Sequence, residues 1–135
     1  MPDQEKESLK IIPREGVSLE LQVRNHRLTI DQPVDDGGKN AGIAPLEMFV
    51  GSLGACIGYF AVRFCLRHKI PHEGLEVSME WDYAENPHRI GKITTDVKLP
   101  KGWNPEMNER FLKVIGGCTV HHSITVAPEI TINLR

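Results

Sequence analysis

Two cysteines, Cys56 and Cys118, are the side chains in this sequence best suited to covalent chemistry. A thiolate is a strong nucleophile at neutral pH once a positive charge or a helix N-terminus lowers its pKa. Cys118 follows Gly116-Gly117 and precedes His121-His122, so a helix beginning there would place its first backbone N–H groups near the sulfur. The unreactive alternative is that each cysteine is a small buried apolar side chain, which is a common state of free cysteine.

Cys65, the third cysteine, is expected in the core because it lies between Phe64 and Leu66. It follows Cys56 by nine residues, and at about 100° per residue a helix places these two side chains on opposite faces. This spacing argues against a Cys56–Cys65 disulfide and favours Cys56–Cys118 as the pair.

The composition is that of a globular protein and limits the classes of partner. The chain has 135 residues, 40% of them apolar and 25% charged, as is typical of one globular domain. The formal charge of −2 does not favour a nucleic-acid partner, which usually demands a basic face. We therefore expect a single domain over residues 1–135, with residues 1–7 as a mobile tail.

The location is predicted from the N-terminus and the cysteines. The first ten residues, MPDQEKESLK, contain no apolar core and predict no signal peptide. The longest apolar stretch, Leu46 to Leu66, is interrupted by Glu47 and Arg63, which indicates a buried helix and no membrane partner. An odd number of cysteines favours a reducing, cytoplasmic environment.

A long helix beginning at Pro45 must position Cys56. Proline fits the first turn of a helix, where its missing N–H group is not needed. The apolar residues that follow recur with a helical period: Leu46, Phe49, Val50, Leu53, Ile57, Phe60, Ala61 and Phe64. Small residues, among them Gly54 and Gly58, favour another backbone packing close to this helix. Pro71 is expected to end it.

Alternating apolar and polar residues predict strands on both sides of this helix. The predicted strands are 17–23, 27–30, 75–83, 93–99 and 130–134, with turns at 25–26 and 85–88. Asn104-Pro105-Glu106 predicts the start of a second helix, Gly116-Gly117 its end, and residues 118–124 one or two further helical turns. Adjacent strands without intervening helices favour an antiparallel α+β fold.

Three segments resemble the OsmC/Ohr family. Pro45-Leu46-Glu47-Met48-Phe49, leading to Leu53-Gly54-Ala55-Cys56, resembles the central helix of that family. Cys118-Thr119-Val120-His121 resembles its Cys-Pro-Val-His-like segment. Ile30-Asp31-Gln32-Pro33, followed by Gly37-Gly38, resembles the loop before the helix in the OsmC-like branch. The resemblance covers about residues 17–134, and the order and separation of the segments make it specific.

The resemblance implies an OsmC-like α+β fold with antiparallel sheets and a long central helix, in an intertwined homodimer. It also implies a peroxidase that reduces organic hydroperoxides in oxidative-stress defence, with its sites at the dimer interface. By position, Cys56 would be the peroxidatic thiol, which becomes a sulfenic acid, and Cys118 the resolving thiol, which condenses with it. An external dithiol would reset the disulfide by exchange, and this chemistry requires no metal or organic cofactor.

The resemblance further implies an arginine from the N-terminal sheet beside the reactive thiol, held by a glutamate at the start of the central helix. Arg24, on the polar face of its predicted strand, is the first candidate, and Arg27 is the alternative. Glu47 is the only acidic residue at the helix start, where it either holds the arginine or caps the helix. Two positions depart from the peroxidase branch of the family: Leu46 stands where that branch has glutamate, and Thr119 where it has proline.

Two other classes of function stay open. One is a protein of this fold with little catalysis, which binds a small apolar ligand at a dimer interface lined by Leu53, Ile57, Phe60 and Trp103, although the same residues are typical of a core. The other is a metal-binding module, whose zinc ligands would be Cys56, Cys118, His121 and His122. The spacing of this second set matches no recognised zinc pattern.

Overall fold

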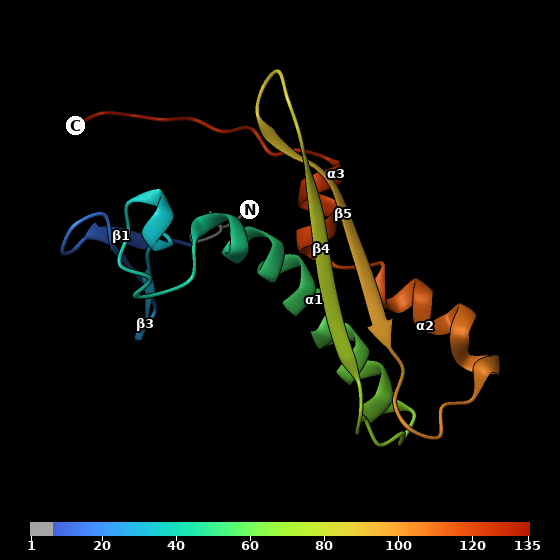
Figure 1. Ribbon diagram of the computed structural model, residues 1–135. Helices are drawn as coiled ribbons and strands as arrows, with labels where there is room; N and C mark the ends of the chain where they lie inside the picture. Colours follow the sequence, from blue (N-terminus) through green and yellow to red (C-terminus); the bar gives the residue numbers. More distant parts are fainter. Residues whose placement is uncertain (1–6) are drawn as a thin grey trace, which may run out of the picture. The chain divides into compact units, whose positions relative to one another are not determined.

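The computed structural model describes residues 7–135; residues 1–6, and with them most of the predicted N-terminal tail, lie outside the described residues. Its elements are β1 (Lys10–Pro13), β2 (Leu19–Val23), β3 (His26–Ile30), η1 (Val34–Asp36), α1 (Pro45–Arg67), β4 (Glu76–Ala84), β5 (Arg89–Lys98), η2 (Pro105–Met107), α2 (Asn108–Ile115) and α3 (Thr119–Thr125). Both sheets, β1-β2-β3 and β4-β5, are antiparallel (Figure 1). The predicted α+β class with a long helix is confirmed.

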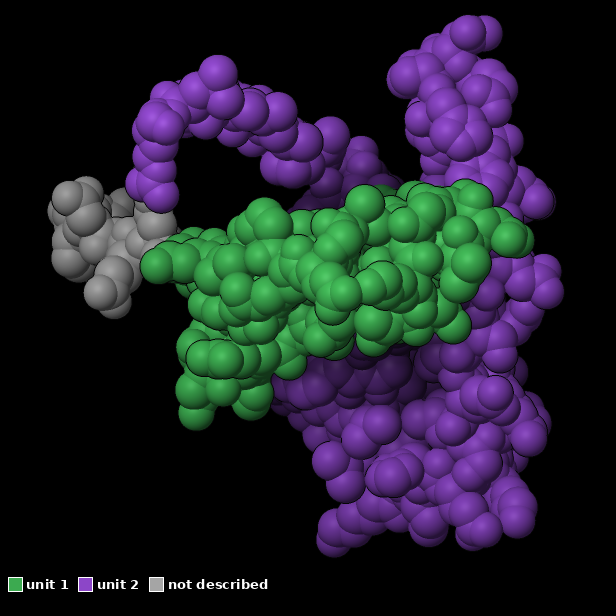
Figure 2. Space-filling model, turned by 60° about the vertical axis from the view of Figure 1, so that its left-hand side comes forward, with its two compact units in different colours: residues 1–49 green, residues 50–135 purple. Residues whose placement is uncertain are grey.

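The chain divides into two compact units, residues 1–49 and residues 50–135, and the division falls inside α1 (Figure 2). Unit 1 contains β1, β2, β3 and η1, whereas unit 2 contains most of α1 together with β4, β5, α2 and α3. The expectation that the whole chain is a single domain stays a prediction.

The sheet of unit 1 has one apolar and one polar face, as the alternating sequence predicts. Leu21 of β2 pairs with Ile11 of β1 and with Leu28 of β3, which places these three side chains on the same face. The strand β1 was not predicted, because Lys10-Ile11-Ile12-Pro13 lacks a clear alternation.

The turn between β2 and β3 lies one residue earlier than predicted. Val23 pairs with His26, which leaves Arg24 and Asn25 as a two-residue turn. Arg24 adopts a left-handed conformation, with a φ angle of 52°. The placement of Arg24 on the polar face of a strand is therefore wrong: the alternation Ser18, Glu20, Gln22, Arg24 continues in the sequence past the end of β2.

The loop from β3 to α1 is ordered by the carboxylate of Asp31. This side chain is buried and accepts hydrogen bonds from the backbone N–H groups of Gln32 (2.8 Å), Lys39 (3.1 Å) and Ala41 (3.1 Å). The N–H groups of Ala41 and Gln32, followed by that of Lys39, hold the pKa of Asp31 below its usual range. Gly38 also belongs to this loop, and a side chain there would overlap the backbone of Gln32.

Asp31→Asn is expected to lower the melting temperature of the protein at neutral pH, because a neutral amide offers one acceptor oxygen to three N–H groups. The folded-state pKa is lowered, so the stabilisation is complete above the unfolded value of about 3.9 and is lost as the pH falls through the folded value. The difference in melting temperature between the parent and Asp31→Asn should therefore shrink below about pH 4. Thermal unfolding followed by circular dichroism between pH 7 and pH 3 measures this gap.

The matched control is Asp35→Asn, because Asp35 is an exposed acidic residue of η1 in the same loop. It should melt like the parent at every pH. A gap between the parent and Asp31→Asn that stays constant down to pH 3 would contradict the account.

In unit 2 the small residues of α1 permit close packing on β4. A Cβ atom added at Gly54 would lie 3.2 Å from Cγ of Met79, and one at Gly58 would lie 3.8 Å from Val77. Val77 and Met79 lie on the same face of β4, which Figure 1 shows running alongside α1. The predicted close neighbour of this helix was another backbone, whereas the atoms found next to Gly54 and Gly58 belong to the side chains of Met79 and Val77.

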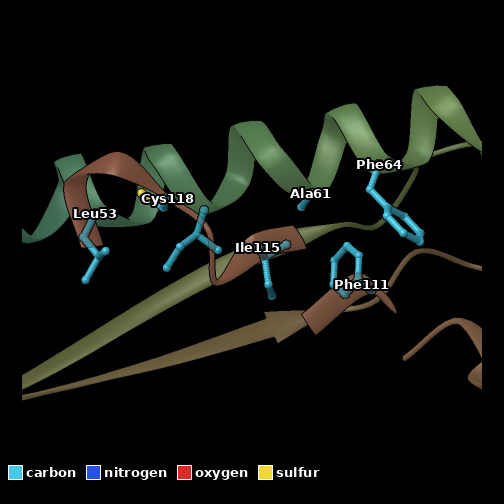
Figure 3. Packing of buried hydrophobic residues seen from close by; sticks show 7 residues of the cluster. Leu53, Ala61, Phe64, Phe111, Ile115 and Cys118 are labelled. Atoms are coloured by element: carbon cyan, nitrogen blue, oxygen red, sulfur yellow. The ribbon is translucent and has the colours of Figure 1, made fainter. Parts of the chain in front are cut away.

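The core of unit 2 lies between α1 and α2. Its buried members are Leu53, Ile57, Ala61, Phe64, Phe111, Ile115 and Cys118. Figure 3 shows Phe64 of α1 beside Phe111 of α2, and their rings meet edge to face with centroids 5.3 Å apart. Cys65 is fully buried as predicted, and this burial raises the pKa of its thiol.

The helix α1 ends at Arg67, before Pro71. Lys69 takes a left-handed conformation (φ 56°), and the N–H of Ile70 donates to the carbonyl of Cys65, which closes the helix end. In the described part of the chain α1 alone is long and apolar enough to cross a membrane, a property shared by core helices. Because its buried residues form the core of unit 2, we assign α1 to the core.

The predicted strand over residues 130–134 is wrong. Helix α3 ends at Thr125, and no strand is formed after it in the described chain. Ile130, Ile132 and Leu134 are 79%, 87% and 97% exposed. Their alternation is that of a strand, but a strand exists only where a neighbouring backbone completes its hydrogen bonds, and nothing in the described chain supplies one.

Candidate active site

The structure joins Cys56 of α1 and Cys118 in a disulfide across 62 positions of the sequence. Their Cα atoms are 5.9 Å apart, within the range that disulfides require. Both residues belong to unit 2. The pair that the helical spacing favoured is the pair that the structure brings together, while the catalytic role of each thiol stays a prediction.

The two cysteines of this pair differ in burial. Cys118 is fully buried and belongs to the core cluster, whereas Cys56 is only partly buried and packs against that cluster. A dissolved oxidant can therefore reach Cys56 more readily than Cys118. The Cα separation suits a two-step reaction in which Cys56 is oxidised first and Cys118 then forms a disulfide with it.

Cys118 stands at the start of α3, as the sequence predicted for the turns after Gly116-Gly117. Its backbone is extended, and its carbonyl accepts the first helical hydrogen bond, from the N–H of His122. The neighbouring His121 and His122 are exposed, with ring centroids 6.2 Å apart. Within residues 7–135 no group of three or more His, Cys, Asp or Glu side chains is arranged to hold a metal ion.

Glu47 takes the capping alternative that the sequence left open. Its Oε1 accepts a hydrogen bond from the backbone N–H of Ala44, 2.8 Å away, at the start of α1. This hydrogen bond satisfies a backbone donor that the start of a helix leaves unpaired.

The two candidate arginines occupy different settings in unit 1. The carboxylate of Glu20 pairs with Arg27 (3.6 Å) and with Arg14 (3.0 Å), and hydrogen bonds from Gln22 and Arg14 hold the pKa of Glu20 below its usual range. Arg24 forms no ion pair with the residues that the structure describes. The arginines and Glu47 lie in unit 1 and the thiols in unit 2, so the roles of Arg24, Arg27 and Glu47 at the thiol stay predictions.

Glu20 is the polar residue of this region that sequence reasoning missed. Gln22 pairs with Arg27, so Glu20 lies diagonally across from Arg27 on the same face of the sheet. With the turn at residues 24–25 and not at 25–26, the partner of Arg27 is Gln22 and not Arg24, and this shift brings Arg27 next to Glu20.

The residues proposed to line an apolar ligand site belong to the core. Leu53 and Ile57 are buried in the core cluster of unit 2, and Phe60 and Trp103 pack against that cluster. The indole N–H of Trp103 donates to Oδ1 of Asn108 at 2.7 Å. These contacts account for the four side chains as packing residues.

Residues 37–133 match the family model described as OsmC-like protein. No curated protein sequence matches the chain significantly. Among solved structures, the chain is similar to a candidate osmotic stress induced and detoxification response protein from Psychrobacter arcticus (TM-score 0.78, 18% identity, 91% of each chain covered). It is also similar to an OsmC like protein from Mycoplasma pneumoniae (TM-score 0.74, 18% identity, covering 91% of this chain and 89% of the other).

The name of a third similar structure includes an activity. It is an organic hydroperoxide resistance protein OsmC from Legionella pneumophila, also described as a predicted redox protein and regulator of sulfide bond formation. The TM-score is 0.58, with 18% identity and 89% of each chain covered. At 18% sequence identity, these similarities show the fold of the chain alone.

Proposed function

The chain belongs to the OsmC-like protein family, whose model covers residues 37–133, and from this premise we propose that it reduces organic hydroperoxides in defence against oxidative stress. The observation that carries the proposal is the Cys56–Cys118 pair, with Cα atoms 5.9 Å apart. The similar protein from Legionella pneumophila, named for organic hydroperoxide resistance, supports the same class of substrate.

In the proposed reaction the Cys56 thiolate attacks one oxygen of the O–O bond. That oxygen stays on sulfur as a sulfenic acid, and the other leaves as an alcohol after taking up a proton. The thiol of Cys118 then displaces the sulfenic hydroxyl as water and forms the disulfide. An external dithiol reduces the disulfide by exchange and is itself oxidised to a disulfide. The partial exposure of Cys56 supports its assignment to the first step.

A guanidinium group beside Cys56 would stabilise the thiolate, and two arginines compete for this role. Arg27 is held on a strand by Glu20, whereas Arg24 lies in a turn and Glu47 is engaged in capping α1. These contacts favour Arg27. The rate of Cys56 alkylation, measured against pH in Arg24→Ala and Arg27→Ala, decides between them. Loss of the arginine that stabilises the thiolate should move the rise of this rate to higher pH.

The proposal predicts that reduced protein loses two free thiols per chain on reaction with one equivalent of cumene hydroperoxide. Thiol titration before and after the reaction measures this loss, and mass spectrometry of peptides should locate the new bond between Cys56 and Cys118. Buried Cys65 should remain a free thiol. Full retention of all three thiols under these conditions would sink the proposed function.

We also infer a homodimer, which the unpaired C-terminal segment supports. Val126, Ile130, Ile132 and Leu134 are exposed apolar side chains of this segment, and pairing with a second chain would remove them from water. Sedimentation should give twice the 15.2 kDa mass of one chain, and removal of residues 127–135 should shift the protein toward monomer. A monomeric parent at micromolar concentration contradicts the inference.

A further inference from the structure

Helix α3 is attached to the rest of unit 2 by few contacts. None of its residues is buried, and in the described chain its hydrogen bonds run only between residues 118 and 126. Val120 is the one side chain of α3 that packs, partly buried, against the core. A seven-residue helix has little stability of its own, so α3 depends on what fixes its ends.

The disulfide fixes the first end of α3. Cys118 immediately precedes the helix, is fully buried and is bonded to Cys56 of α1. On its other side Gly116 and Gly117 connect it to α2, and glycine permits more backbone freedom than any other residue. Once the disulfide is broken, the packing of Cys118 and Val120 is what still connects α3 to the core of unit 2.

Cys56 and Val120 pack on the same core cluster, and Figure 3 shows Cys118 beside α1 near Leu53. Because Cys118 is bonded to Cys56, the residue that precedes α3 covers part of the Cys56 side chain. A movement of α3 away from α1 would expose the sulfur that first meets an oxidant.

We propose that residues 116–126 form a lid over Cys56, which the disulfide holds shut and which reduction of the disulfide frees. A dithiol supplies two electrons and two protons, the Cys56–Cys118 bond breaks into two thiols, and the dithiol becomes a disulfide. While Cys56 is reduced, the lid opens and closes, held by the packing of Cys118 and Val120, and it is locked shut when the disulfide forms. This device requires only that the bond forms and breaks, so it stands whether or not organic hydroperoxides are the physiological oxidant.

Hydrogen–deuterium exchange of the full chain, oxidised and reduced at one pH, tests the lid. Reduction should speed exchange of the amides of residues 122–126, which donate the hydrogen bonds of α3, at least tenfold, while the amides of α1 between residues 53 and 64 change less than threefold. Cys56→Ala should show fast exchange in α3 without reductant and no response to reductant. Cys65→Ala, which keeps the disulfide, should respond like the parent.

Alkylation supplies a second measurement, made on reduced protein. Val120→Ala removes the one packed side chain of α3 and should speed alkylation of Cys56 by iodoacetamide at least threefold, whereas Ser123→Ala, an exposed position of the same helix, should leave the rate unchanged. The proposal is overturned if exchange in residues 122–126 is the same in both redox states although titration shows the freed thiols. If Val120→Ala leaves the alkylation rate unchanged, α3 does not cover Cys56 and the proposal is wrong.

Discussion

Cys56→Ser is expected to abolish turnover of organic hydroperoxides, with a loss of about three orders of magnitude or more in rate. A serine hydroxyl is not ionised near neutral pH and cannot attack the O–O bond as a thiolate does. The partly buried position of Cys56, against the full burial of Cys118, makes it the sulfur that an oxidant meets. Consumption of cumene hydroperoxide in the presence of excess dithiothreitol measures the loss.

Cys118→Ser should behave differently from Cys56→Ser. It should react once with peroxide and then accumulate a sulfenic acid at Cys56, which dimedone traps and mass spectrometry locates, because the sulfur that would condense with it is gone. Cys65→Ala serves as the control and should keep parental turnover, since Cys65 is buried outside the disulfide. Turnover by Cys56→Ser at the parental rate would show that the nucleophile lies elsewhere.

The parts of the fold that the sequence predicted well are those specified by local periodicity. The helix from Pro45, the β4-β5 hairpin and the start of the helix at Asn104 each follow from side-chain spacing or a capping residue. Asn104 accepts from the N–H of Glu106 as its type and position predicted. The Cys56–Cys118 pair was also favoured by helical geometry, because a spacing of nine residues places Cys56 and Cys65 on opposite faces of the helix.

The parts that could not be predicted depend on contacts between distant residues. The three N–H groups that surround the Asp31 carboxylate come from up to ten positions further along the loop, and no pattern in the sequence marks them. Arg24 was misplaced because polar alternation continues beyond the last paired residue of β2. Residues 130–134 carry a strand pattern, but whether they form one depends on a neighbouring backbone and not on their own side chains.

Phe64→Ala is expected to cost about 3–5 kcal/mol of the free energy of unfolding, the range seen when a large aromatic side chain is removed from a core. The ring of Phe64 is 2% exposed and contacts three other rings, those of His68 (centroids 4.1 Å apart), Phe111 (5.3 Å) and Trp103 (6.0 Å). Its removal leaves a cavity between α1 and α2 that neighbouring rings cannot fill without leaving their own contacts. Because domains of this size are stable by about 5–15 kcal/mol, the loss is a large share of the total.

Urea denaturation followed by circular dichroism measures this loss as a fall in the transition midpoint. Leu66→Ala is the matched control, because Leu66 lies two residues further along α1 and is 67% exposed. It should shift the free energy of unfolding by less than about 0.5 kcal/mol. Equal losses in the two variants would mean that the faces of α1 contribute alike to stability, which contradicts a core centred on Phe64, Phe111 and Ile115. A Phe64→Ala protein that also loses the Cys56–Cys118 bond would show that this core holds α1 within reach of Cys118.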